Sequence, residues 1–137
     1  MSVYLLDTNH LSAALHTSGG VRRRIMTAAR AGHRLGTCVP VLCELGVGFA
    51  QTPSPDRNWK ALSVFLQHIR VWPIEVEIAR AYAYIHRELR AKGRVLSQVD
   101  MMLAALARSG DLVVLTTDRD FEAVGGMRTE NWVAGQV

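Results

Sequence analysis

Four carboxylic acids stand beside or within apolar segments of the chain, where a charged side chain is unexpected. Asp7 follows a run of apolar residues, and Glu44 and Asp100 are each the only charge within a longer apolar stretch. The fourth acid, Asp118, comes shortly after the apolar segment 112–115. Burying an unpaired carboxylate is costly, and no lysine or arginine within these stretches can serve as a local partner. A divalent cation shared by several of the acids is the simplest solution.

The acids also indicate which cation and which chemistry to expect. All-oxygen ligation suits Mg²⁺, or Mn²⁺ as a substitute, and argues against zinc. Magnesium commonly keeps several waters and binds substrate phosphates, so the pattern favours hydrolysis of a phosphodiester by an activated water. The net charge of +4 is compatible with a polyanionic substrate, although mild basicity is also common among small soluble domains.

Apolar strand-like segments alternate with amphipathic helical segments along the chain, which predicts an α/β fold with a parallel sheet. In such sheets the carboxyl ends of the strands share one edge, where ligands bind, so the four acids are expected to meet there. Thr8 or Asn9 is expected to cap the first helix. The predicted strands are 3–6, 35–39, 71–74, 112–115 and a last edge strand within 127–132; the longer predicted helices are 21–31, 41–50, 57–69, 75–92 and 97–107.

Length and composition indicate one soluble domain. A chain of 137 residues with 49% hydrophobic residues can bury a core as a single domain over 1–137. No apolar run is long enough for a bilayer span, Asp7 interrupts the only early apolar stretch, and two cysteines are too few for a disulfide framework. We therefore expect a cytoplasmic protein with no membrane segment.

Four motifs together resemble the PIN domain, and more closely the VapC-type toxins of bacterial type II toxin–antitoxin systems. They are Leu-Leu-Asp-Thr-Asn at 5–9, Glu44 within Val-Leu-Cys-Glu-Leu-Gly-Val-Gly, Asp100 within Asp-Met-Met-Leu-Ala-Ala, and Leu-Thr-Thr-Asp-Arg-Asp-Phe at 115–121. Each motif alone is weak, but their order and spacing are specific, and the likeness runs from residue 3 to about residue 132.

The resemblance implies a three-layer α/β/α sandwich with a central, mainly parallel five-stranded sheet. It implies a Mg²⁺- or Mn²⁺-dependent endoribonuclease that is the toxin of a type II system, a homodimer, and inhibition by a cognate VapB-type antitoxin. Carried over by position, Asp7 and Asp100 match the main metal ligands, and Glu44 matches the acid that helps bind metal or orient water. Asp118 matches the fourth acidic position of the cluster.

Supporting roles are also carried over or weighed. Asn9 matches the polar residue that supports the first acid, and Thr116 matches the hydroxyl that hydrogen-bonds into the cluster. Asp120 is an extra acid, for which a solvent-facing or capping role is favoured over contact with a second metal. His10 could contact substrate, and the basic run 22–24 is either a solvated helix face or a phosphate contact.

Three alternatives remain open at this point. The first is a housekeeping PIN nuclease that processes RNA without an antitoxin, and the second is a degenerate PIN domain, which the four filled acidic positions disfavour. The third is a receiver-like signalling domain, which clusters acids around Mg²⁺ but also needs a lysine at a strand end. Only Lys60 and Lys92 are present, and neither lies at a predicted strand end.

Overall fold

A parallel five-stranded sheet forms the centre of the structure, a computed structural model that describes residues 1–16 and 18–133. The spatial order is β3-β2-β1-β4-β5, and every neighbouring pair runs parallel. The strands are β1 (Val3–Leu6), β2 (Arg34–Cys38), β3 (Arg70–Trp72), β4 (Val113–Leu115) and β5 (Arg128–Glu130). The short third and fifth strands are the edges, as the sequence predicted.

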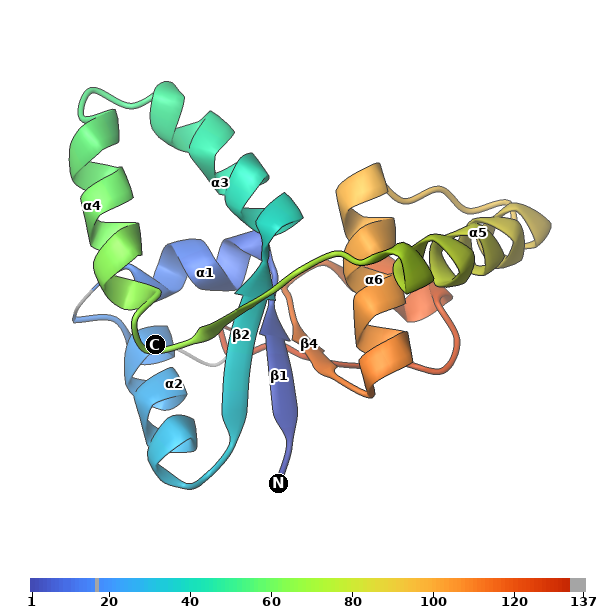
Figure 1. Cartoon of the computed structure of the whole chain (residues 1–137), viewed down its shortest axis with the longest axis horizontal. Coiled ribbons are helices and arrows are strands. Elements are labelled where there is room, and N and C mark those ends of the chain that lie inside the picture. The colour runs from blue at the N-terminus through green and yellow to red at the C-terminus, as the bar shows by residue number, and fades with distance from the viewer. Residues whose placement is uncertain (17, 134–137) are drawn as a thin grey trace.

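Helices cover both faces of this sheet, which gives the predicted α/β/α layering. Helices α1 and α2 lie on one side of the strands and α5 and α6 on the other (Figure 1). Helix α3 continues from the carboxyl end of β2 and contacts both α1 and α6. The helices are α1 (Thr8–Ala14), α2 (Gly20–Arg30), α3 (Val39–Ala50), α4 (Pro55–Phe65), α5 (Val76–Ala91), α6 (Gln98–Gly110) and the 3₁₀ helix η1 (Arg119–Ala123).

Strands β1 and β4, which pair at the middle of the sheet, are apolar along their length because both of their faces are covered. Leu5 and Leu6 of β1 are fully buried, as are Val114 and Leu115 of β4. At Gly36, a Cβ atom would lie 2.5 Å from the carbonyl oxygen of the neighbouring strand's first residue, so only glycine allows β2 and β3 to pair this closely. No helix within the described ranges is long and apolar enough to cross a bilayer.

Two local predictions were wrong. Asp7, not Thr8 or Asn9, caps α1, because its backbone is extended (φ −76°, ψ 168°) and its carboxylate accepts the Thr8 N–H. Helix α4 ends at Phe65 rather than Ile69, because the chain tightens there through i to i−3 hydrogen bonds and then enters β3. The apolar spacing that suggested a longer helix therefore continues into a turn.

The chain order creates a switch point between β1 and β4. From β1 the chain moves outward to β2 and β3, then returns to the other side of β1 to form β4 and β5. In open α/β sheets, ligands bind outside the carboxyl ends of the strands at such a point. The Asp7 N–H donates to the Leu115 carbonyl at 3.0 Å, so the two strands stay paired to their ends. The residues that follow them therefore emerge side by side.

Candidate active site

Asp7 lies at the centre of the site and is held by hydrogen-bond donors on both carboxylate oxygens. Oδ1 accepts the Thr8 N–H at 2.7 Å, and Oδ2 accepts the Thr116 hydroxyl at 2.7 Å and the Asn9 amide at 3.4 Å. Its side chain is buried, with 4% of the residue exposed. Burial raises the pKa of Asp7 and outweighs the lowering by Thr116 and Thr8, while the negative charges of Glu44 and Asp118 raise it further.

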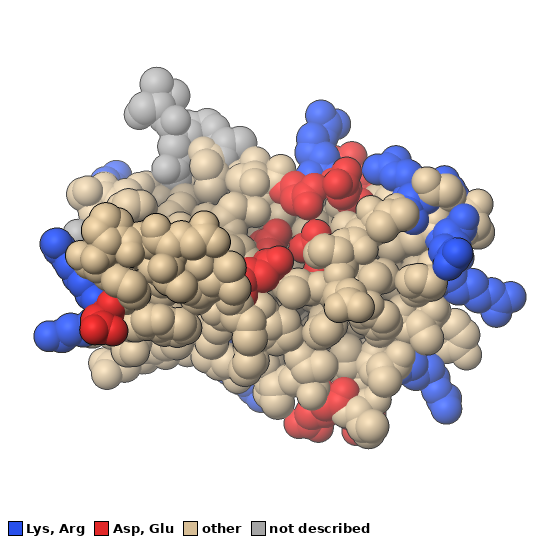
Figure 2. All heavy atoms as spheres, turned by 90° about the horizontal axis from the view of Figure 1, so that it is seen from above, with Lys and Arg blue, Asp and Glu red and all other residues tan. Residues whose placement is uncertain are grey.

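Asp100 is the second acid with a shifted pKa, and the charges that act on it come from the other three predicted acids, so the four side chains lie near one another. The pKa of Asp100 is raised to about 6, first by burial and then by the negative charge of Asp7, with further contributions from Asp118 and Glu44. The Ser97 hydroxyl, at the start of α6, lowers it in part. Figure 2 looks onto the face where the strands end and shows acidic side chains gathered near its middle, with lysine and arginine towards the rim.

The protein supplies no basic partner to these four acids within the part of the chain that the structure describes. Ion pairs form elsewhere, on exposed surfaces, and each uses a different carboxylate. They join Arg94 to Asp120, Arg108 to Glu88, Arg119 to Glu122 and Arg128 to Asp111. The repulsion within the acidic site is therefore not compensated by an arginine or lysine.

The donor set fits a hard divalent cation in kind. It offers carboxylate oxygens, and the nearby Cys38 thiol stays neutral because burial raises its pKa to about 11. Magnesium needs only one or two protein carboxylates alongside water, so the set is sufficient for Mg²⁺ or Mn²⁺. Across residues 1–16 and 18–133, however, no three His, Cys, Asp or Glu side chains already stand in a geometry that could hold an ion. A complete ligand set would require the acids to close in against their repulsion.

Glu44 and Asp118 are each anchored to the hydrogen-bond frame around Asp7. Glu44 is exposed, and its Oε1 accepts the Thr8 hydroxyl at 2.7 Å, which ties α3 to α1. The Asp118 N–H donates to the Thr116 hydroxyl at 3.0 Å, and its carboxylate accepts the N–H of Asp120 at 2.8 Å. Asp118 is therefore the cap of η1, and the exposed Asp120 carboxylate instead lies 3.7 Å from Arg94.

His10 has a role that the sequence did not indicate. It is fully buried, so a contact with substrate is excluded. The Trp132 N–H donates to Nε2 at 2.9 Å, so Nε2 must be unprotonated, and Nδ1 carries the proton that it shares with Asn9 Oδ1 at 2.7 Å. Thr117 N–H donates to the same Asn9 oxygen at 3.1 Å, which turns the amide NH₂ of Asn9 towards Asp7. Burial, followed by the charge of Arg24, lowers the pKa of His10 to about 4 and keeps it neutral.

The basic run 22–24 is largely committed to packing. Arg22 donates to the Ala14 carbonyl at 3.2 Å and lies over the Phe65 ring, and the guanidinium of Arg24 lies 4.6 Å from the centre of the Trp132 ring. These contacts hold α2 against the neighbouring elements, and they leave Arg22 and Arg24 less available to bind a phosphate.

Both the sequence and the fold of this chain match known proteins. The model of the PIN domain family matches residues 4–127. A tRNA(fMet)-specific endonuclease VapC from Shigella flexneri is 37% identical over 92 residues, which cover 66% of this chain and 70% of that protein. Ribonuclease VapC2 from Haemophilus influenzae is 31% identical over 137 residues, covering 97% of this chain and all of that protein. A crystal structure of DNA-bound VapBC from Salmonella typhimurium contains a chain with a TM-score of 0.84 and 29% identity, covering 96% of this chain and 99% of that one.

The raised pKa of Asp100 predicts how stability depends on pH when EDTA removes divalent ions. Between about pH 4 and pH 6 the folded chain holds a proton on Asp100 that the unfolded chain has lost, so this group makes the free energy of unfolding fall as pH rises. We expect urea denaturation to show that, from pH 4 to pH 6, the free energy of unfolding of wild type falls by on the order of 1 kcal/mol more than that of Asp100→Asn. This figure allows for solvent screening. Asp111→Asn, a control at an exposed position, should show the same pH dependence as wild type. If the free energy of unfolding of wild type and of Asp100→Asn changes equally with pH, the raised pKa of Asp100 is contradicted.

The His10 contacts predict that two amide substitutions separate activity from stability. In His10→Asn the new amide can still donate to Asn9. Asparagine is smaller than glutamine and leaves a larger cavity, so His10→Asn should be less stable than His10→Gln. His10→Gln can keep an acceptor for Trp132 but loses the donor to Asn9. We expect RNA cleavage by His10→Gln to be about tenfold slower than by His10→Asn, assayed where both are folded by circular dichroism. Activities that simply follow the order of stability would indicate a purely structural histidine.

Proposed function

Because the chain belongs to the PIN domain family and, within it, to the VapC ribonucleases, we propose that it hydrolyses RNA phosphodiester bonds at the acidic site with the help of Mg²⁺ or Mn²⁺. The observation that carries this proposal is the coupling of four carboxylates at the switch point of the sheet, with no basic partner among the described residues. A site of this kind favours a divalent cation and, through it, a phosphate.

In this proposal Asp7 and Asp100 hold the ion, with Glu44 and Asp118 at its periphery. When bound, a divalent ion supplies charge neutralisation at the phosphate and a water of lowered pKa. The Thr8 N–H and the Thr116 hydroxyl hold the Asp7 carboxylate in one orientation before any ion arrives, which reduces the reorganisation needed. Glu44 is exposed and accepts the Thr8 hydroxyl on Oε1, which leaves Oε2 available to orient an attacking water.

The proposed substrate class and partners follow from the relatives. The Shigella protein's name specifies a tRNA, so we propose structured RNA of the tRNA class as the first substrate to test. A VapB-type antitoxin partner and a homodimer are proposed on the same family grounds, and the Salmonella structure is of a VapBC complex. A housekeeping PIN nuclease would share the chemistry but would not be inhibited by the product of a neighbouring antitoxin gene.

The receiver-like alternative receives no support from the placement of the lysines. Lys60 lies on α4, and Lys92 follows α5 and donates to the Ala123 carbonyl at 2.7 Å. Neither stands at the end of a strand, where phosphoryl transfer to an aspartate would need it.

The proposal predicts that Asp100→Asn abolishes RNA cleavage while the fold survives, because a charge is lost at nearly constant volume. It is the cleaner substitution, because Asp100 is only half-buried and its carboxylate interacts with the Ser97 hydroxyl, whereas Asp7 is buried and Asp7→Asn disturbs the bonds from both Thr8 and Thr116. Cleavage of bulk tRNA should drop at least a hundredfold in both variants and persist in the exposed control Asp111→Asn.

The same assay tests metal dependence. EDTA should stop cleavage by wild type, and Mn²⁺ or Mg²⁺ should restore it. Cleavage retained by both purified acid variants, or undiminished in EDTA, would overturn the proposal.

A further inference from the structure

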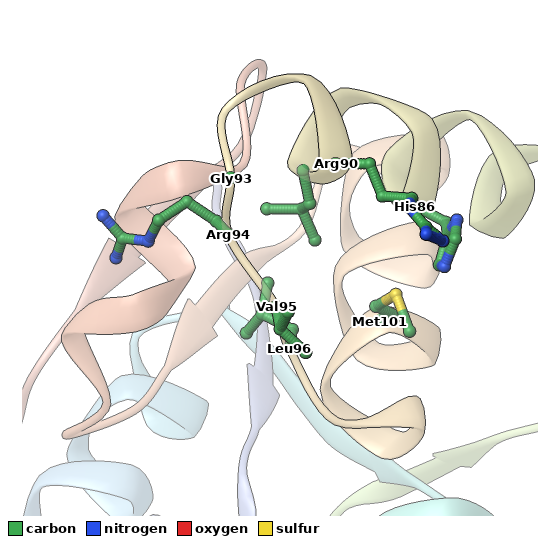
Figure 3. Close-up of a pocket in the computed structure, with 8 residues that line it drawn as sticks. His86, Arg90, Gly93, Arg94, Val95, Leu96 and Met101 are labelled. Carbon is green, nitrogen blue, oxygen red and sulfur yellow. The ribbon is translucent and has the colours of Figure 1, made fainter.

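A pocket lies between the last turns of α5, the connection 92–97 and the first turn of α6, the helix that also carries Asp100 (Figure 3). Its volume is about 450 Å³, within the range of small-molecule sites. The apolar part of its lining comes from Leu89, Leu96 and Met101, which are themselves buried. Val95, which is 88% exposed, also lines the pocket.

The polar part of the lining is entirely cationic or imidazole. His86 and Arg90 come from one face of α5, and Arg94 comes from the connection. No carboxylate of the described chain lines the pocket. Arg90 also stabilises the C-terminal end of α5 through the helix dipole, but that does not account for His86 and Arg94 at the same pocket. Such a lining selects an anion that carries an apolar part, as a nucleotide does.

Two observations relate the pocket to the acidic site. Met101 lines the pocket, and Asp100, the residue before it, belongs to the acidic cluster. Arg94 extends away from His86 and Arg90 in Figure 3, and its guanidinium lies 3.7 Å from the Asp120 carboxylate. Both partners of this ion pair are more than half exposed, so it is weak and a phosphate can displace it. Cations therefore flank the pocket on the side of the acids and on the far side.

We infer that this pocket binds one nucleotide of the RNA next to the cleaved bond, with its flanking phosphates on Arg94 and Arg90 and its base against the apolar lining. The inference rests on the proposed function. Four clustered carboxylates repel the RNA backbone, so the protein must hold the strand by cations placed just outside the cluster. An acidic segment of a protein partner would meet the same charges, but only the substrate must run from the acidic site into its neighbour.

The test compares Arg90→Gln and Arg94→Gln with Arg57→Gln, an exposed arginine of α4 on the other side of the molecule (Figure 1). On a short single-stranded RNA, each pocket variant should raise KM about tenfold with little change in kcat, because it removes binding that the ground state and the transition state share. The slope of log(kcat/KM) against log salt should become shallower by about one for each lost phosphate contact. Val95→Asp, at an exposed position that the fold tolerates, should also raise KM by placing a negative charge at the pocket.

The outcomes separate the two proposals. If wild type cleaves RNA but Arg90→Gln and Arg94→Gln match Arg57→Gln in KM and salt slope, the nucleotide pocket is wrong and the ribonuclease stands. Unchanged KM together with weakened inhibition by the antitoxin would assign the pocket to a protein partner and also overturn the inference. If wild type cleaves no RNA, the proposed function fails, and this inference fails with it.

Discussion

Electrostatic repulsion among Asp7, Glu44, Asp100 and Asp118 is the constraint around which this structure is organised. The negative charges of Glu44 and Asp118 raise the pKa of both Asp7 and Asp100, and no arginine or lysine of the described residues pairs with any of the four acids. Such an arrangement lowers the stability of the free protein, since like charges are held together in a partly buried site. We expect such an arrangement in a site that binds a cation. The ends of β1 and β4 are paired, and this pairing brings Asp7 and the segment that carries Asp118 close together.

Under the proposed function, the groups that orient the acids differ from the groups that bind the substrate. Neutral groups hold the centre: the Thr8 N–H and the Thr116 hydroxyl fix Asp7, and the His10 tautomer sets the orientation of the Asn9 amide. Cationic groups stand outside, where Arg94 pairs with Asp120 rather than with an acid of the cluster. An arginine inside the cluster would neutralise the acids and compete with a metal ion. On the rim it can attract a phosphate without doing so.

Sequence reasoning succeeded where a residue's type conflicts with its surroundings. A charge beside an apolar strand is visible without a structure, so the β1 strand and the parallel α/β class could be predicted, and the four acids could be chosen as candidates, whose catalytic role stays a prediction. It failed where the partner is remote in the chain. The sequence around His10 does not indicate that its ring accepts a hydrogen bond from Trp132. The sequence around Arg94 likewise does not indicate that it pairs with Asp120. The cap of α1 was misassigned because Asp7 serves both as cap and as acid of the site, and pattern alone does not show that one carboxylate does both.

Thermal unfolding with and without Mn²⁺ tests the shared acidic site most directly, because an ion that binds only the folded chain raises its stability in proportion to the logarithm of its concentration. Adding Mn²⁺ at about a hundred times its Kd should raise the free energy of unfolding of wild type by about 2.7 kcal/mol. The account predicts that Asp100→Asn loses most of this gain and that Asp111→Asn keeps it. An equal gain in all three proteins, or none in wild type, would contradict the claim that these acids form one cation site.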